Sequence, residues 1–175
     1  HNRAIAQIDA KAGKSPASVK NVAIWGNHSA TQVPDVTAAL VDGVPVKQVI
    51  ADHEWLKNGF VTTVQQRGAA VIKMRGASSA ASAAVAIADH LRDWHRGTAP
   101  GVAVSMAIPS DGSYGVPKGL VFSYPVTIAN NGKYEIVQGI NLDDDVRARI
   151  EVTKQELLDE QKTAFAALGI APPKL

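Results

Sequence analysis

Two side chains in the first 30 residues could act together on a small anionic acid. His28 lies in the segment WGNHS at 25–29, and Arg3 lies near the start of the chain. An imidazole changes its charge near neutral pH, so it can accept a proton from an alcohol and return it to a ketone. A guanidinium offers a planar fork that holds a carboxylate by two parallel hydrogen bonds. The pair suits chemistry on a 2-hydroxy or 2-oxo acid, although a histidine in a Gly-Asn turn is more often a capping or packing residue.

The segment RGASS at 75–79 is a second place where a small anion could bind. Its glycine would allow a ligand to approach the backbone, and the hydroxyls of Ser78 and Ser79 lie beside amides that a helix start leaves free. The local sequence also supports a simpler interpretation, in which Ser78 is the N-cap of the next helix and Ser79 is a small packing residue. The local sequence leaves both interpretations open.

Two groups of acidic and histidine side chains resemble metal ligands by composition only. One is the run DHE at 52–54, and the other spreads over residues 89–95. His90 and His95 are five residues apart, which places them about 140° apart around a helix rather than on one face. Metal ligands have to converge, so we expect solvated helix positions and no metal site.

Composition favours an ordinary globular enzyme domain and excludes several other classes. The chain has 175 residues, 46% hydrophobic and 19% charged, which is enough for one domain with a sizeable core. The formal charge is only +2, basic residues are spread from Arg3 to Lys174, and Trp, Tyr and Phe occur three times each, so we expect no nucleic-acid partner. The absence of cysteine excludes disulfides and thiolate metal sites. No apolar run approaches the roughly 18 residues that span a bilayer, so we expect no membrane partner.

The pattern of apolar residues predicts helices and strands in mixed order. Helical spacing is found over 2–12, 52–73, 78–95 and 143–168, and the third of these has a stripe, Ala83, Ile87, Leu91 and Trp94, that we expect to be buried. Strands are predicted over 19–25 and 102–108, with hairpins joining 36–41 to 44–46 and 120–129 to 134–137. Because tight turns join the strands and no GxGxxG is present, we expect an α+β fold with mixed, largely antiparallel sheets and packed helices.

Eight segments in a fixed order resemble one enzyme family. They are HNRA at 1–4 with AQ at 6–7, WGNHS at 25–29, PDV at 34–36, TVQQRGAAVIK at 63–73, RGASSAASAA at 75–84, SYGVP at 113–117, YPVTI at 124–128 and ELL at 156–158. Together they resemble the C-terminal, substrate-binding half of the cytosolic-type malate dehydrogenases of the lactate/malate dehydrogenase family. WGNHS differs from the Gly-Glu-His-Gly setting of the catalytic histidine in the related lactate dehydrogenases. The resemblance covers essentially the whole chain and implies the fold of that C-terminal domain.

The resemblance also implies a role for each candidate residue. His28 would be the catalytic proton acceptor and donor, and Arg3 would bind the substrate carboxylate. Ser78 would line the substrate pocket, whereas Asn27 and Ser79 are weaker candidates for contact with the cofactor. The implied reaction is the NAD-dependent, reversible oxidation of malate to oxaloacetate, a step of the tricarboxylic acid cycle. A cytoplasmic homodimer is the implied form.

One departure from the family pattern concerns the residues before His1. The family reads Leu-Asp-x-Asn-Arg-Ala, and its Asp orients the catalytic histidine, but this chain begins at the x position. The dinucleotide-binding half is also absent. We therefore interpret residues 1–175 as one substrate-binding domain that is inactive when isolated.

Two other functions remain open. The chain could be a non-catalytic oligomerisation fragment or paralogue, which its Ala-rich helix faces would suit. It could equally belong to a dehydrogenase for another 2-hydroxy acid, because the loop that selects the substrate side chain is not in this sequence. The retention of Arg3, Asn27 and His28 together favours the enzyme.

Overall fold

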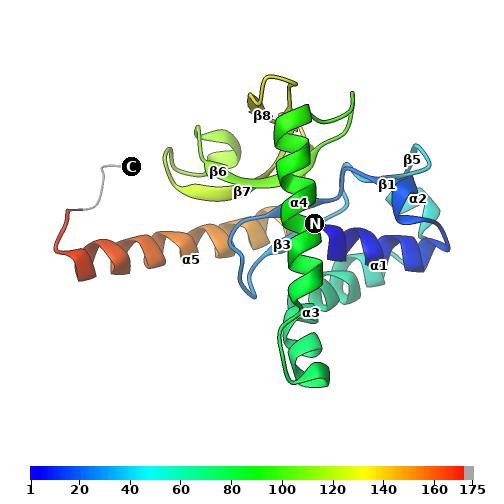
Figure 1. The fold of residues 1–175 in the computed structure, drawn as a ribbon, viewed down its shortest axis with the longest axis horizontal. Coiled ribbons are helices and arrows are strands. Elements are labelled where there is room, and N and C mark those ends of the chain that lie inside the picture. The colour runs from blue at the N-terminus through cyan, green and yellow to red at the C-terminus, as the bar shows by residue number, and fades with distance from the viewer. Residues whose placement is uncertain (172–175) are drawn as a thin grey trace.

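The computed structural model describes residues 1–171 and shows helices packed around three small sheets (Figure 1). The helices are α1 (Asn2–Ala12), η1 (Pro16–Ser18), α2 (Val46–Val49), η2 (Trp55–Gly59), α3 (Phe60–Arg75), α4 (Ala80–Arg96), η3 (Ser113–Gly115) and α5 (Asp144–Leu168). The strands are β1 (Val19–Lys20), β2 (Ala23–Trp25), β3 (Val33–Asp35), β4 (Leu40–Val41), β5 (Val44–Pro45), β6 (Val104–Pro109), β7 (Val121–Ile128) and β8 (Tyr134–Ile136).

All the strand pairs in these sheets are antiparallel. The sheets have the orders β1-β4-β5, β2-β3 and β6-β7-β8. An isolated bridge between Gly26 and Ser123 joins the end of β2 to β7. This arrangement confirms the expected α+β fold with mixed helices and antiparallel sheets.

Two clusters of buried apolar side chains form the core, and β2 contributes to both. Ile24 belongs to the cluster that includes α1 and the start of α3. Ala23 and Trp25 belong to the cluster formed with β6, β7 and the first half of α5. Successive residues of a strand point to opposite faces, so one short strand can pack against both clusters. The segment that follows β2 therefore starts from the centre of the domain.

The structure confirms the first predicted helix and the position of the turn in the first predicted hairpin. Gly13 has a φ of 64° and ends α1 in the left-handed conformation, as a C-cap glycine does. Asp42 and Gly43, with φ of 50° and 81°, form the turn between β4 and β5. Pro45 lies in β5, an edge strand, because proline has no N–H to donate to a ladder. The hairpin strands are shorter than predicted, since residues 46–49 form α2.

The prediction of one strand over residues 19–25 is wrong. Asn21 has a φ of 59°, which separates β1 from β2. Its side chain donates to the carbonyl of Gly101 at 3.0 Å and accepts from the amide of Ala103 at 2.8 Å. Asparagine tolerates the left-handed region better than most residues, and these two bonds to a distant segment stabilise it there.

The predicted buried stripe on α4 is also wrong. Ile87, Leu91 and Trp94 are 60%, 56% and 43% exposed, and no residue of α4 is buried. The helix crosses the other elements in Figure 1. Asp89 accepts a hydrogen bond from Asn2, Trp94 donates one to the carbonyl of Gly132, and Ser79, just before the helix, accepts one from Arg3. Periodicity identified an amphipathic helix, but no other element of residues 1–171 covers its apolar face.

Helix α5 packs against the rest of the domain as far as Glu160. Ile150 and Thr153 are buried, and Leu157 and Leu158 pack against the same core cluster, whereas Leu168, a predicted apolar anchor, is 69% exposed. The carboxylate of Asp143 accepts from the amide of Val146 at 3.0 Å and so caps the helix. The C-terminal end of the helix extends away from the sheets in Figure 1. The packed part is the one that reaches the segment after β2.

Candidate functional site

The segment of residues 26–32, which we call the His28 loop, begins from a rigid base. Trp25 is fully buried, and its indole Nε1 donates to Asp35 Oδ2 at 3.0 Å. Asp35 is only 4% exposed, and its other oxygen accepts from the amide and the hydroxyl of Thr37 at 2.8 and 2.6 Å. Buried carboxylates are stable only when such donors satisfy them. The strand before the loop and the strand after it are thereby joined.

Gly26 allows the loop to approach α5 more closely than any other residue could. It has a φ of 89°, and a Cβ at this position would lie 2.1 Å from Cγ2 of Thr153, which is fully buried. Gly26 also exchanges two backbone hydrogen bonds of 3.1 Å with Ser123 on β7. The start of the loop is therefore held between β7 and α5.

Polar side chains of α5 bind the rest of the loop. The amide nitrogen of Asn27 donates to Thr153 Oγ1 at 2.9 Å, and its side-chain Nδ2 donates to Glu156 Oε2 at 3.2 Å and to Glu160 Oε1 at 2.9 Å. Ser29 Oγ donates to Glu156 Oε2 at 2.6 Å. These bonds connect the loop to three positions on one face of α5.

Thr31 completes this set of contacts from the far end of the loop. Its hydroxyl donates to Glu156 Oε2 and is hydrogen-bonded to Thr153 Oγ1 at 2.8 Å. The hydrogen bonds from the hydroxyls of Ser29 and Thr31 hold the pKa of the Glu156 carboxyl below its usual value, and the Asn27 amide adds to the effect. Glu156 is therefore a carboxylate at neutral pH, with one oxygen that accepts from three loop side chains.

His28 itself is exposed, as is Ala30 of the same loop. Its backbone amide donates to Asn27 Oδ1 at 2.8 Å, so the Asn27 side chain bridges His28 and α5. Within residues 1–171 the imidazole makes no hydrogen bond, and it is open to solvent. The arrangement presents an imidazole, which is able to transfer a proton, on a loop whose Asn27, Ser29 and Thr31 side chains are bonded to α5.

Arg3 and Ser79 come together at a second position. Arg3 lies exposed in the first turn of α1, and its Nη2 donates to Ser79 Oγ at 3.4 Å. Gly68 of α3 leaves room for the guanidinium, since a Cβ there would lie 3.4 Å from Arg3 Nη1. The N-cap of α4 is Ser79 and not Ser78, so the capping interpretation of Ser78 is wrong. Ser78 is exposed in the turn immediately before it.

Ser105 on β6 connects the start of α1, which carries Arg3, to β2, which precedes the His28 loop. Its Oγ accepts from the amide of Ile24 at 2.9 Å and is hydrogen-bonded to Nδ1 of His1, the N-cap of α1, at 3.1 Å. Ile24 lies two residues before Gly26, and His1 lies two residues before Arg3. One hydroxyl thus holds the start of α1 beside the strand that carries the His28 loop, although Arg3 and His28 make no direct bond in the part of the chain described.

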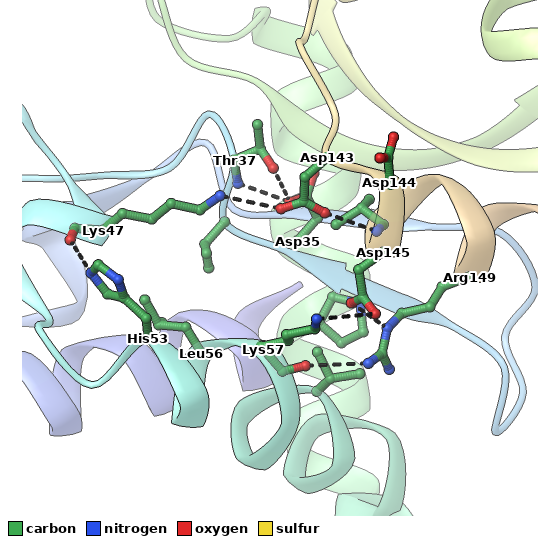
Figure 2. Close-up of a pocket in the computed structure, with 14 residues that line it drawn as sticks. Asp35, Thr37, Lys47, His53, Leu56, Lys57, Asp143, Asp144, Asp145 and Arg149 are labelled. Atoms are coloured by element: carbon green, nitrogen blue, oxygen red, sulfur yellow. Dashed lines mark hydrogen bonds and ion pairs between the residues drawn. The ribbon is translucent and has the colours of Figure 1, made fainter.

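A cavity of about 430 Å³ lies elsewhere, between η2 and the start of α5, and none of the candidate residues lines it (Figure 2). Several of its charged groups are paired, among them Lys47 with Asp143 at 3.4 Å and Arg149 with Asp145 at 2.9 Å. The Val146 amide, with Lys47 nearby, lowers the pKa of Asp143. This region is one of ion-paired packing at a helix start rather than a substrate site.

The groups that resembled metal ligands stay apart. Among residues 1–171 no three His, Asp or Glu side chains lie close enough to hold a metal ion. Asp89 and Asp93 instead pair with Arg92 at 2.6 and 3.2 Å. In the same part of the chain, no helix has both the length and the hydropathy required to cross a membrane.

The sequence did not reveal the role of Thr153, Glu156 and Glu160. Their spacing of three and four places them on one helix face, which a helical projection of 143–168 could have shown. The partner of that face could not be found in this way, because the loop lies 126 residues before Thr153.

The fold and these side chains define a class: an α+β domain with an exposed imidazole on a fixed loop and an exposed guanidinium at a helix start. Residues 1–168 match the family model for the lactate/malate dehydrogenase, alpha/beta C-terminal domain. The chain belongs to this family, and it corresponds to that C-terminal domain.

Similar proteins agree with this assignment. The chain is 51% identical to the cytoplasmic malate dehydrogenase of Medicago sativa over 97% of its own length and 52% of that protein. It resembles the crystal structure of malate dehydrogenase from Naegleria fowleri with a TM-score of 0.86 and 46% identity, covering 93% of this chain and 49% of that one. For Trichomonas vaginalis lactate dehydrogenase in complex with NADH and oxamate, the TM-score is 0.89 and the identity 32%, covering 96% and 52% of the two chains. The chain spans about half the length of these relatives.

Proposed function

We propose that residues 1–175 form the C-terminal substrate-binding domain of a cytoplasmic, NAD-dependent malate dehydrogenase, which catalyses the malate–oxaloacetate step of the tricarboxylic acid cycle. The observation that carries this proposal is the exposed His28 in WGNHS, on a loop that α5 and β7 hold. Relatives about 50% identical bear the name cytoplasmic malate dehydrogenase. The other side of the site would come from a dinucleotide-binding half like that of the longer relatives.

His28 would transfer the proton in both directions. In malate oxidation its neutral imidazole accepts the proton of the C2 hydroxyl, while the hydride on C2 leaves to the cofactor. In oxaloacetate reduction the charged imidazole donates to the carbonyl oxygen, and the proton and hydride together restore the alcohol. An exposed imidazole on this loop fits the role, because the ring is accessible while hydrogen bonds hold the backbone that carries it.

Arg3 would bind the carboxylate next to the reacting carbon. Its guanidinium can form two parallel hydrogen bonds with a carboxylate, which would fix the orientation of C2 relative to His28. Ser79, which already contacts Nη2, and exposed Ser78 provide hydroxyls on the same side. NAD supplies the hydride acceptor when it is bound.

The exposed turn of residues 76–79 fits a ligand beside Arg3, and Ser79 is the residue we propose to face the cofactor. Asn27 is a weaker candidate for this contact. Both hydrogens of its amide go to α5, and its oxygen accepts from His28. Because these groups are already hydrogen-bonded, we propose that Asn27 contacts the cofactor only through the edge of its side chain.

Substrate choice distinguishes this proposal from its alternatives. We expect the full-length protein to oxidise malate with a higher kcat/KM than lactate or than branched and aromatic 2-hydroxy acids, as followed by NADH absorbance. A preference for one of the other acids would identify a different dehydrogenase. No turnover with any of them would support the non-catalytic alternative, and residues 1–175 alone should show no turnover in either case.

We also propose that the protein is a homodimer, with α4 in the subunit contact. Ile87, Leu91 and Trp94 are 60%, 56% and 43% exposed on one side of this helix, and exposed apolar surface of this kind marks interaction sites. Sedimentation equilibrium of the full-length protein should give a dimer, and Leu91→Glu should shift it toward monomer. A monomeric wild type would exclude this proposal without affecting the catalytic one.

A further inference from the structure

One face of α5 holds the His28 loop at alternate residues, Asn27, Ser29 and Thr31. Thr153, Glu156 and Glu160, at spacings of three and four, contact the loop through Asn27 and two hydroxyls. The far end of the loop is held separately, because Gln65 of α3 donates to the carbonyl of Gln32 at 2.7 Å. His28 and Ala30 are the exposed residues that this arrangement leaves pointing outward.

Glu156 is the centre of the arrangement. Its Oε2 accepts from Ser29 Oγ at 2.6 Å, from Thr31 Oγ1 and from Asn27 Nδ2 at 3.2 Å, so residues on both sides of His28 converge on a single oxygen. Each hydroxyl has one proton, and giving it to Glu156 leaves the hydroxyl oxygen free to accept. Ser29 Oγ does accept from the Thr31 amide, at 3.0 Å. Only a charged, acceptor-only group satisfies three donors in this way.

We propose that Glu156 is a positioning residue for His28, and that it acts on proton transfer without touching the substrate. This inference rests on the proposed function, since it assumes that His28 transfers the proton. By fixing Asn27 and Ser29, Glu156 fixes the backbone of the residue between them, and Asn27 Oδ1 accepts directly from the His28 amide. A shift of about 1 Å in a reacting group can cost on the order of 100-fold in rate.

The geometry also indicates which kinetic constant depends on Glu156. Arg3, which binds the substrate carboxylate in the proposed mechanism, bonds to Ser79 and makes no bond to the His28 loop within the described residues. Substrate and cofactor affinity should therefore be nearly independent of Glu156. The chemical step, in which His28 accepts or donates the proton, should not be.

The test compares Glu156→Gln with Glu151→Gln in the full-length enzyme. Glu151 is on the same helix, is 61% exposed, and within residues 1–171 pairs only with Lys154, so its variant is a control for loss of a helix carboxylate. We expect Glu156→Gln to lower kcat by roughly 10- to 100-fold with KM for oxaloacetate within about 3-fold of wild type. With malate deuterated at C2, the isotope effect on kcat should rise, because a slower chemical step becomes rate-limiting. Loss of folded enzyme would lower kcat without raising the isotope effect.

A double-mutant cycle with His28 decides whether Glu156 acts through the imidazole. In a His28→Asn background, Glu156→Gln should cause no further loss of kcat, because residues that act as a unit are strongly non-additive. Equal losses in both backgrounds, or an unchanged kcat in the single variant, would overturn the proposal. If Glu156→Gln does not fold, Ser29→Ala, which removes one of the three donors, takes its place with a smaller loss of the same kind. If His28→Asn alone retains wild-type turnover, the proposed function has failed first, and this outcome is distinguishable from the others.

Discussion

The His28 loop (residues 26–32) and the segment of residues 76–96, which comprises the turn after α3 and helix α4, both carry candidate site residues, but the fold supports them very differently. The loop is bonded to β7, to α3 and to three residues of α5. The other segment has no buried residue in α4, and Ser79 contacts Arg3 at 3.4 Å. Both segments are exposed at the residues proposed to meet substrate.

The two glycines that open these segments show the same difference. Gly26 and Gly76 both have positive φ, at 89° and 69°. A Cβ on Gly26 would collide with Thr153, whereas a Cβ on Gly76 would meet nothing within 4 Å. The first glycine permits a close approach between segments, and the second permits only the left-handed end of α3.

The two segments therefore suit different roles in the proposed site. A proton-transferring group benefits from a fixed position, because geometry controls the rate of transfer. A helix with an exposed apolar face benefits from surfaces outside the described chain, such as a second subunit or a further domain. We infer that this domain supplies the contacts that hold the loop, whereas other surfaces complete the contacts of α4.

The largest expected effect is on the loop. His28→Asn in the full-length enzyme should lower kcat by at least about 100-fold, the lower range for general acid–base catalysis, because asparagine can occupy the site but cannot carry the proton. NADH affinity, measured by fluorescence titration, should stay close to the wild-type value. A kcat within a few-fold of wild type would remove His28 from the mechanism and, with it, the functional meaning of the fixed loop.

The two glycines give the next largest difference. Gly26→Ala combines a strained φ with overpacking against buried Thr153, so the free energy of unfolding should fall by about 3 kcal/mol. Gly76→Ala has only the conformational cost and should lose about 1 kcal/mol. Urea unfolding of both full-length variants measures the difference. Equal losses would mean that the loop does not depend on its close contact with α5.

Arg3→Lys tests the side of the site that includes Ser79. Lysine keeps the charge but loses the planar fork, so kcat/KM for malate should fall by roughly 10- to 100-fold. Cofactor affinity should hardly change. Should steady-state kinetics instead be normal while only the melting temperature moves, Arg3 would be a residue that packs against α3 and α4.

The smallest effect concerns the acid stability of the contact between the loop and α5. The pKa of Glu156 is lower in the folded protein than in the unfolded chain, so the carboxylate stabilises the fold above the unfolded pKa of about 4.3. That stabilisation is lost as pH falls through the lower, folded pKa. The difference in melting temperature between wild type and Glu156→Gln should therefore be present at pH 7 and shrink below about pH 4. A difference independent of pH would mean that the charge of Glu156 does not contribute.

Local features of the chain were predicted well wherever a local cause determined them. Gly13 ends α1, the turn at Asp42-Gly43 joins two short strands, and α5 ends at Leu168 as predicted. Each of these depends on residues within one or two turns of chain. The break at Asn21 was missed because two bonds to residues 101 and 103 stabilise it.

The face of α4 shows where periodicity stops being informative. The spacing of Ile87, Leu91 and Trp94 correctly indicates a helix with one apolar side. Whether that side is buried depends on what packs against it, which is not encoded in the spacing. The prediction of a buried stripe added a partner that residues 1–171 do not provide.

For the site, the sequence by itself determined the candidate residue types and their local frame. Histidine and arginine are the residue types for proton transfer and carboxylate binding, and the strand and helix that carry them follow from nearby residues. Only the tertiary structure decided that Thr153, Glu156 and Glu160 hold the His28 loop, across separations of 122 to 133 residues. The physical reason is that local periodicity determines which side chains share a helix face, whereas the packing of the whole domain determines which distant hydroxyls and amides that face meets.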